Sequence, residues 1–408
     1  MDFTVSEEMS ALLETVRRFI ATELAPLEHE VEERGVLAPE VARTIFEKSS
    51  ALGLYAMNVP ERFGGGGLSA VETVMVEEQF GHTTDILVRR AFGNVYEVLF
   101  AADAAQTERW LLPCVRGERT ASIAITEPDA GSDAAGITTR AERVAPGWRI
   151  NGAKHFISDA AFSDFFVVSA VTDPAKRSRG ISLFLVDKAA PGVTLGRDQP
   201  MMGLRGTSHH ELFFDDVEVG DEHLLGEEGT GYAQVLATLG RVRLAQVGAR
   251  SVGKASHVLD LMTRHAAARR QFGQAIGEFQ MVQQLLADSV IDVNAARLLV
   301  LRAAWELDAG RDARDWIAMV KVHASEALGR VVDRAVQVFG GMGYCKDLSI
   351  ERYYRDARVA RIYDGASEIH RMVVARDALR SGAALFDSMG SGGWAPEPHA
   401  ATARGGGR

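Results

Sequence analysis

The chain has 408 residues, of which 47% are hydrophobic and 25% are charged, and its formal net charge is −10. This composition is typical of a globular protein, and the length suggests two or three domains. The acidic balance argues against nucleic acids and anionic membranes as the main partner. No apolar run is long enough for a transmembrane helix. The only cysteines are Cys114 and Cys345, so a disulfide framework or cysteine-based metal site is not expected, and a cytoplasmic location is favoured.

Residues 1–120 are predicted to form an N-terminal α-helical domain. Apolar residues such as Met9, Val16 and Phe19 recur at steps of three and four, which predicts a helix from Ser6 to about Val31. Thr4 and Glu7 have the spacing of a capping box just before it. The glycine-rich stretch 60–67 predicts a turn, and the residues after it again have a pattern typical of helices.

Residues 121–228 are predicted to form a small middle β domain. Short apolar runs at 121–126, 165–171 and 181–186 indicate strands. Asn151–Gly152 separates two alternating segments, 148–150 and 154–158, and this dipeptide favours a tight hairpin turn between them.

Residues 229–387 are predicted to form a C-terminal antiparallel helical bundle. Apolar stripes run through 282–307 and 317–338, each about the length of one long helix. Residues 388–408 are rich in Gly, Pro and Ala and are predicted to be a disordered tail. The fold class is therefore α+β, mostly α. Because helices and strands are segregated, a doubly wound parallel sheet is excluded, and no Rossmann unit can hold a dinucleotide.

Two segments imitate phosphate-binding loops. Residues 65–70 match a relaxed GxGxxA pattern without a preceding strand, and 248–254 match most of a Walker A pattern. Ala255 stands where a Walker A motif needs Ser or Thr, and the segment lies in a helical pattern. We interpret its glycines as sites of close helix packing. The pair His209–His210 is interpreted as solvated or hydrogen-bonded, and no metal site is predicted.

Three segments carry a specific resemblance. They are Ile-Thr-Glu-Pro-Asp-Ala-Gly-Ser-Asp at 125–133, Arg-Arg-Gln-Phe-Gly at 269–273 with Gln280 beyond, and 337–368 with its Gly-Gly-Met-Gly-Tyr and Tyr-Asp-Gly-Ala-Ser-Glu stretches. In order and spacing the chain resembles the acyl-CoA dehydrogenase family over residues 1–387. The resemblance implies FAD between the β domain and the bundle, an acyl-CoA substrate and α,β-dehydrogenation. A carboxylate would remove the α-proton, the β-hydride would pass to flavin N5, and an electron-transfer flavoprotein would take the electrons. The family default is a homotetramer, or dimer of dimers.

The resemblance also implies the cofactor contacts. Thr126 and Ser132 match positions that hydrogen-bond the flavin ring and pyrophosphate region. Phe156 and Ser158 match positions beside the flavin, where the family often has Trp and Thr. The positions that reach the FAD of a neighbouring subunit are matched by Arg269, Phe272, Gln280, Gln337 and Gly341. For Arg270 a solvated helix end is the preferred interpretation. Ser132, Tyr363 and Gly365 match substrate-binding positions.

Asp364 stands where many family members carry the catalytic Glu, so the resemblance implies that it is the base. Its carboxylate reaches roughly 1.5 Å less far than that of Glu. Some family branches place the base on a bundle helix, but the corresponding segment 238–244 contains no carboxylate. Capping of the helix that begins near Ala366 is the alternative role. Arg89–Arg90 could pair with a substrate carboxylate, although a solvated helical face is the preferred interpretation.

Other functions compete with the dehydrogenase. A flavin oxidase of the same fold, similar to nitroalkane oxidase, would also use an Asp base. A flavin-containing, DNA-associated protein is disfavoured by the negative charge. A structural oligomer without ligand is disfavoured by the three motif segments.

Overall fold

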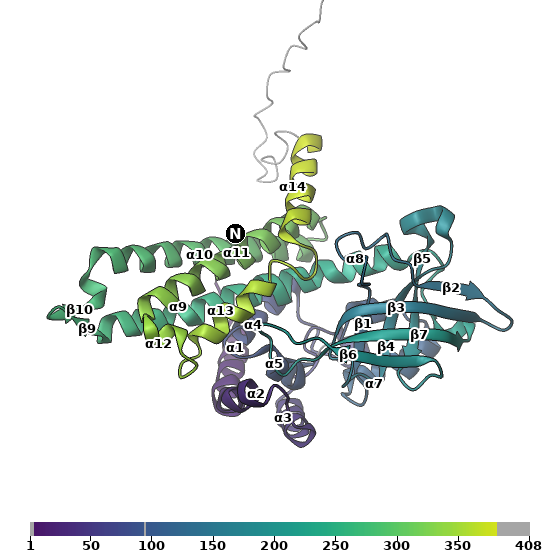
Figure 1. Ribbon diagram of the computed structural model, residues 1–408, viewed down its shortest axis with the longest axis horizontal. Coiled ribbons are helices and arrows are strands. Elements are labelled where there is room, and N and C mark those ends of the chain that lie inside the picture. The colour runs from purple at the N-terminus through teal and green to yellow at the C-terminus, as the bar shows by residue number, and fades with distance from the viewer. Residues whose placement is uncertain (1–3, 94, 382–408) are drawn as a thin grey trace, which may run out of the picture.

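The computed structural model describes residues 4–93 and 95–381. A β-sheet lies at one end of the molecule, the long C-terminal helices extend towards the opposite end, and helices α1 to α3 lie below the junction between them (Figure 1). This arrangement of an N-terminal helical part, a middle sheet and a C-terminal bundle confirms the predicted fold class. The tail predicted at 388–408 lies outside the described residues.

The N-terminal part contains α1 (Glu7–Phe19), α2 (Glu28–Arg34), α3 (Pro39–Ala51), α4 (Ala70–Phe80), α5 (Asp85–Phe92), α6 (Ala104–Gln106) and α7 (Leu112–Val115). Helices α1 to α5 share one apolar core, whereas α7 packs into a second core with strands of the middle sheet. The predicted first helix is interrupted by a π-helical turn at Ile20–Leu24 and a 3-10 turn at Ala25–Leu27, which contains Pro26. The capping prediction was wrong. Ser6 is the N-cap, and its hydroxyl accepts a 3.1 Å bond from the N–H of Met9.

The middle sheet contains β1 (Ala121–Ala124), β2 (Arg140–Arg143), β3 (Trp148–Ser158), β4 (Phe165–Val171), β5 (Ile181–Asp187), β6 (Val193–Asp198), β7 (His209–Val219) and β8 (Leu224–Leu225). Their order is β6-β7-β3-β2-β4-β5-β8, with β1 parallel to β4. The runs predicted at 165–171 and 181–186 form β4 and β5, which are almost wholly buried and pair antiparallel. They are buried because apolar segments cover both faces of the sheet.

The hairpin predicted at Asn151–Gly152 is wrong. A single strand, β3, runs through both residues and pairs with β7, and its register shifts between Ile150 and Gly152. The Asn151 side chain donates 3.0 Å to Asp216 Oδ1 and accepts 2.9 Å from the Asp216 N–H. The dipeptide therefore forms a β-bulge between two strands instead of a turn.

The C-terminal part consists of α8 (Gly231–Val242), the π-helical segment η8 (Arg243–Ala249), α9 (Arg250–Ala268), α10 (Gln280–Asp308), α11 (Arg314–Phe339), α12 (Gly341–Tyr344), α13 (Ile350–Val359) and α14 (Ser367–Ser381). The strands β9 (Arg270–Gln271) and β10 (Gln274–Ala275) form a hairpin between α9 and α10. The predicted stripes lie on α10 and α11, whose buried faces pack together. Among the described residues, no helix is both long and apolar enough to cross a membrane.

Two glycines of the Walker A look-alike allow helices to pack closely. A Cβ added at Gly248 would lie 2.4 Å from Val320 Cγ1, and one at Gly253 would lie 1.8 Å from the Glu78 carbonyl oxygen. Both glycines lie within helical segments. The structure therefore agrees with the packing interpretation.

Candidate functional site

Asp364 lies in a tight turn between α13 and α14. Its φ is +54°, and that of Gly365 is +93°. Asp tolerates this left-handed region better than most residues, and glycine adopts it freely. A Cβ at position 365 would lie 2.8 Å from His370 Nε2. The turn that presents Asp364 therefore requires glycine at 365 on two grounds, backbone conformation and space.

The backbone oxygen of Asp364 is held from two helical segments. Arg243 Nε donates to it at 2.6 Å, and His370 Nε2 lies 3.3 Å away. Within the described residues, neither the carboxylate nor the N–H of Asp364 has a hydrogen-bond partner. The carboxylate therefore caps no helix, and both groups are available to a ligand.

The charges around Asp364 are mostly positive. Burial raises the pKa of its carboxyl group, while Arg243, Lys321 and Arg89 act in the opposite direction. Lys321 is fully buried, and its Nζ has no hydrogen-bond partner in the described part of the chain. Burial lowers the pKa of Lys321 to about 8 and that of His370 to about 4. Because its pKa lies so low, His370 is neutral at neutral pH.

Tyr363, which precedes the base candidate, stays a neutral phenol because burial raises its pKa. Tyr363 and Gly365, both predicted to contact substrate, thus lie at the same turn as Asp364. Ser132, the third such residue, is on an exposed loop of the β domain. No hydrogen bond or ion pair among the described residues joins it to the Asp364 turn.

Three of the predicted flavin contacts lie around the end of β3. The N–H of His155 donates 2.8 Å to the Thr126 carbonyl, and Ser122 Oγ donates 2.6 Å to that of Ser158. Phe156 has a φ of +58° and lies in the register shift between β3 and β7. Its ring is 49% exposed and stacks on the His155 ring at 4.0 Å. The bulge therefore presents an aromatic face beside Thr126 and Ser158.

The loop 127–133 is anchored by a buried ion pair. Lys154 Nζ lies 2.8 Å from Glu127 Oε1, and the same carboxylate accepts bonds of 2.6 Å and 2.9 Å from the N–H groups of Thr138 and Thr139. The backbone N–H groups of 131–133 have no acceptor in the described residues. A fixed loop with free N–H groups suits phosphate oxygens.

The remaining predicted cofactor residues lie elsewhere. Arg269, Phe272 and Gln280 belong to the region of the β9–β10 hairpin, at the tip of the bundle farthest from the sheet (Figure 1). Phe272 is 94% exposed. The ring of His265 on α9 stacks on Phe339 at 4.2 Å, which brings the end of α11, with Gln337 and Gly341, to the same tip. One chain therefore does not bring these five residues to Thr126 or Asp364, and their role towards a neighbouring subunit stays a prediction.

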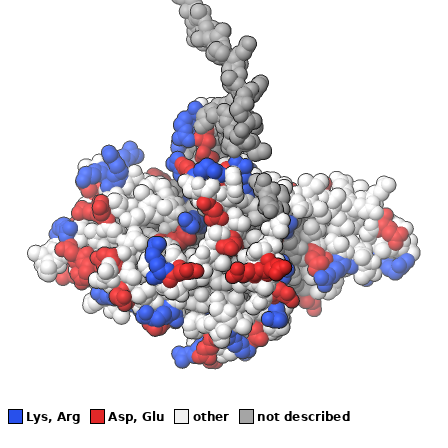
Figure 2. All heavy atoms as spheres, turned by 180° about the vertical axis from the view of Figure 1, so that it is seen from behind, with Lys and Arg blue, Asp and Glu red and all other residues white. Residues whose placement is uncertain are grey.

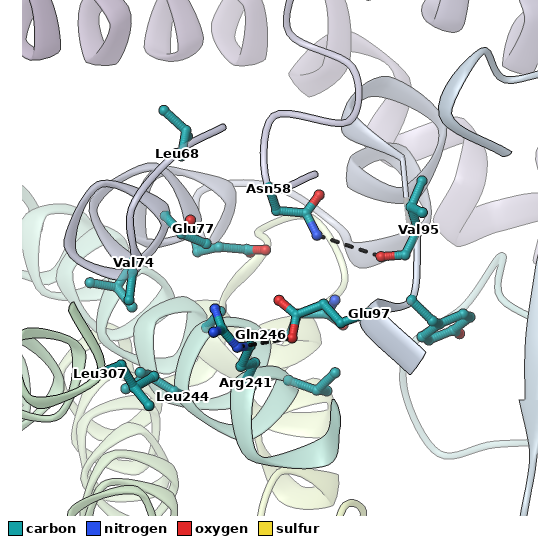
Figure 3. Close-up of a pocket in the computed structure, with 15 residues that line it drawn as sticks. Asn58, Leu68, Val74, Glu77, Val95, Glu97, Arg241, Leu244, Gln246 and Leu307 are labelled. Atoms are coloured by element: carbon teal, nitrogen blue, oxygen red, sulfur yellow. Dashed lines mark hydrogen bonds and ion pairs between the residues drawn. The ribbon is translucent and has the colours of Figure 1, made fainter. Parts of the chain in front are cut away.

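A pocket of about 590 Å³, including its solvent-open part, lies between α4, the segment 95–97 and η8 (Figure 3). Its wall combines apolar and polar side chains, and the apolar ones include Leu68, Val74, Val95, Val242, Leu244 and Leu307. Glu97 faces it and lies 3.2 Å from Arg241. Burial raises the pKa of Glu97 to about 7, while Arg241 opposes the shift. Val242 and Leu244 flank Arg243, so the segment that holds Asp364 also forms part of the pocket wall.

The interpretation of Arg89–Arg90 as a solvated helical face is wrong. Arg90 donates to both carboxylate oxygens of Asp159, at 2.7 Å and 2.8 Å, and lies 3.6 Å over the Phe162 ring. Arg89 Nε is buried without a hydrogen-bond partner in the described residues. Both arginines line a second cavity of about 370 Å³. The sequence pattern could not show this ion pair, because Asp159 is distant from Arg90 in sequence and approaches α5 from the end of β3.

Comparison with known proteins gives matches over nearly the whole chain. Residues 6–118, 122–217 and 229–379 match the acyl-CoA dehydrogenase N-terminal, middle and C-terminal domains. The chain is similar to cyclohex-1-ene-1-carbonyl-CoA dehydrogenase of Geobacter metallireducens, with 39% identity over 92% of this chain and 99% of that one. It is also similar to the CarC subunit of the caffeyl-CoA reductase–Etf complex of Acetobacterium woodii, with 34% identity over 92% and 99%. The solved butyryl-CoA dehydrogenase of Megasphaera elsdenii superimposes with a TM-score of 0.86, at 32% identity over 93% of this chain and 100% of that chain.

The chain belongs to the acyl-CoA dehydrogenase family. It is an oxidoreductase that uses FAD. The described residues of this dehydrogenase fit a flavin nucleotide, because the exposed ring of Phe156 offers a stacking face and the free N–H groups of 131–133 offer donors to phosphate. No group of His, Cys, Asp and Glu side chains in the described part could hold a metal ion.

The sequence did not predict several residues of the candidate site. Arg243 and Lys321 were not considered as neighbours of Asp364, and the pair Glu127–Lys154 was not identified as the anchor of the loop. Lys154 lies at a position of a strand that is expected to be buried. Because buried charges need partners, this position could have indicated the Glu127–Lys154 pair. Glu97 was also missed.

Proposed function

We propose that this dehydrogenase removes the α-proton of an acyl-CoA thioester with Asp364. The observation that carries the proposal is a carboxylate with no hydrogen bond to any described residue, on a constrained turn and with a raised pKa. The turn is anchored to the segment that lines the pocket. A carboxylate whose pKa is raised by burial is a stronger base once deprotonated. The flavin, when bound, accepts the β-hydride.

The backbone of the turn supports the same reaction. The N–H of Asp364 has no acceptor in the described residues, so it can donate to the thioester oxygen and stabilise the charge that develops there. The positive φ fixes the direction of the N–H and the point from which the side chain leaves the backbone. Arg243 binds the backbone oxygen of Asp364, and no described residue binds its N–H or its carboxylate.

Glu97 is the rival base within the pocket. Its pKa is raised to about 7, but Arg241 lies 3.2 Å away and engages the carboxylate. In the part of the chain that the structure describes, Asp364 has no such partner. The segment 238–244 offers no other carboxylate. Asp364 is therefore the favoured base, and Glu97 is the natural control for it.

The electron acceptor and assembly are also proposals. The name of the Acetobacterium relative associates it with Etf, which supports an electron-transfer flavoprotein as the acceptor here. A homotetramer is supported by the hairpin tip, where Phe272 is almost fully exposed among residues matched to cofactor contacts. On the face seen in Figure 2, acidic and basic side chains of the described part are interspersed, which does not favour a DNA-associated role.

Anaerobic spectroscopy of the purified holoenzyme tests the function. A panel of straight, branched, cyclic and carboxylate-bearing acyl-CoAs should bleach the flavin absorbance, while nitroalkanes should not. Bleaching by nitroalkanes and by no thioester would instead establish the oxidase alternative. Addition of electron-transfer flavoprotein should then restore the absorbance by reoxidation.

A further inference from the structure

The bulge in β3 places two consecutive aromatic side chains on the same side of the strand. Neighbouring residues of a regular strand point to opposite faces of the sheet. Lys154 and Ile157, however, are both buried, and the register with β7 shifts between them. His155 and Phe156 lie between these two residues, and their rings stack at 4.0 Å with an angle of 11° between the ring planes. The extra residue of the bulge therefore brings two rings together, which a regular strand would separate.

His155 is held through its backbone and at the edge of its ring. Its N–H donates 2.8 Å to the Thr126 carbonyl. On β7 a single residue, Glu211, lies opposite the two residues of the bulge. Glu211 Oε1 lies 3.9 Å from His155 Nε2 and accepts a 3.3 Å bond from the side chain of Gln199. The imidazole therefore turns its Nε2 edge to Glu211 and its flat face to Phe156.

Phe156 has one covered face and one open face. The imidazole covers the first, yet Phe156 is still 49% exposed. Thr126 and Ser158, which are also predicted to contact the flavin, lie at the same end of β3. Aromatic rings prefer offset-stacked or edge-to-face neighbours, so the open face suits a planar ligand. The bulge thus forms a stacking platform of two rings, of which the outer one is open to a ligand.

We propose that His155 is a positioning residue for FAD and that it acts through Phe156. The imidazole fixes the plane of the Phe156 ring, on which the flavin ring stacks. The left-handed φ of +58° at Phe156 is costly for a residue with a side chain, and the stack with His155 offsets part of that cost. The inference rests on the use of FAD and on the predicted place of Phe156 beside the flavin. It goes beyond the proposed function, because it depends neither on Asp364 nor on the substrate.

FAD binding to the apoprotein tests the inference without turnover. His155→Ala removes the imidazole but keeps the backbone bond to Thr126. It should raise the Kd for FAD about 3- to 10-fold, as expected for the loss of one aromatic pair. It should also shift the visible absorbance and circular dichroism bands of the bound flavin, because these bands respond to the ring that stacks on the flavin. His155→Phe, which keeps a stacked ring, should restore both the Kd and the spectrum, whereas His155→Leu should restore neither.

A double-mutant cycle shows whether His155 acts through Phe156. Phe156→Ala should weaken FAD binding by itself, and the addition of His155→Ala should then have no further effect. Arg149→Ala is the matched control, since it removes an exposed 2.8 Å pair with Glu218 that joins the same two strands away from this bulge. It should leave the Kd and the flavin spectrum unchanged. Far-UV circular dichroism of each apoprotein checks that the variant folds.

Additive effects in the cycle overturn the inference, and so does an unchanged Kd and spectrum in His155→Ala. The same holds if Phe156→Ala binds FAD normally, or if His155→Leu equals His155→Phe in both measurements. These outcomes leave the proposed function intact, because that function is measured as flavin reduction by acyl-CoA in the unsubstituted holoenzyme. Conversely, the expected cycle without any reduction by thioesters would overturn the proposed function alone.

Discussion

Arg243 Nε donates a 2.6 Å hydrogen bond to the backbone oxygen of Asp364. This bond joins η8 to a turn 121 residues later in the chain. It acts on the peptide and not on the carboxylate, so it holds the turn that carries the proposed base and leaves the carboxylate free of this bond. Burial lowers the pKa of Arg243, and Asp364 opposes this shift. Arg243 is therefore a positioning residue.

Arg243→Leu should slow flavin reduction about 10²-fold, because misplacement of a reacting group by about 1 Å has an effect of that size. Arg243→Lys should restore little of the lost reduction rate, since a lysine lacks the planar guanidinium group of arginine. Stopped-flow reduction should show the loss in the limiting rate and not in Kd. A change confined to Kd, or a general loss of FAD, would contradict the positioning role.

Asp364→Asn should retain FAD and bind acyl-CoA but reduce the flavin about 10² to 10⁴ times more slowly, because the amide cannot accept the α-proton. Glu97→Gln is the matched control, since it neutralises a carboxyl group that lines the pocket and whose pKa is also raised. Single-turnover reduction of both variants decides between the two carboxylates. Near-normal reduction by Asp364→Asn would show that the base is misassigned.

The pH dependence of flavin reduction follows from the raised pKa of Asp364. The deprotonated form is the active one, so the rate should fall as the pH drops through a value above the ordinary 3.8 of aspartate. Lys321→Met removes a cation that opposes the shift and should move the inflection to higher pH. The reduction rate measured across pH in both proteins checks the sign. An unchanged or lower inflection in Lys321→Met would contradict the electrostatic account.

Glu127→Gln should destabilise the protein by about 3–5 kcal/mol, because it leaves the buried Lys154 without its counter-charge. Glu142→Gln, at an exposed pair with Arg140, is the control and should change the free energy of unfolding by less than about 1 kcal/mol. Denaturant unfolding measures both. The pKa of Glu127 is lowered to about 2, so its contribution is present above the ordinary 4.5 and should be lost as the pH falls from 4.5 towards 2.

Arg269→Ala should weaken FAD retention, whereas Arg270→Ala should not. Arg270 already donates 3.0 Å to the Gly273 carbonyl within its own hairpin. Gel filtration followed by the ratio of flavin to protein absorbance measures the retained cofactor. Equal retention in the two variants would argue against a cofactor contact at the hairpin.

The sequence predicted those parts of the fold that depend on local pattern. Continuous apolar runs identified β4 and β5, and stripes at helical spacing identified α10 and α11. The hairpin prediction at Asn151–Gly152 was wrong because it rested on a local signal. The partner that turns the dipeptide into a bulge is Asp216, 65 residues later, which no short window contains.

The candidate site shows the same contrast between features that local patterns predict and features that depend on long-range contacts. Asp364 and the loop at 126–133 were predicted from short motifs, whereas Arg243 and Lys321 come from separate helical segments that only the folded chain brings to the turn. Arg89–Arg90 was misinterpreted for the same reason, since Asp159 lies 69 residues beyond Arg90. Long-range ion pairs leave little trace in a single sequence.

The π-helical segment η8 has two structural roles, and together they constrain changes to the pocket. Its residues shape the cavity wall at Leu244, Ala245 and Gln246, and its first residue, Arg243, holds the backbone oxygen of Asp364, the proposed base. Enlarging that wall to admit bulkier acyl chains would shift the backbone that carries the guanidinium. Selection for a new chain length is therefore expected to lower turnover at first, until compensating changes restore the register of the segment.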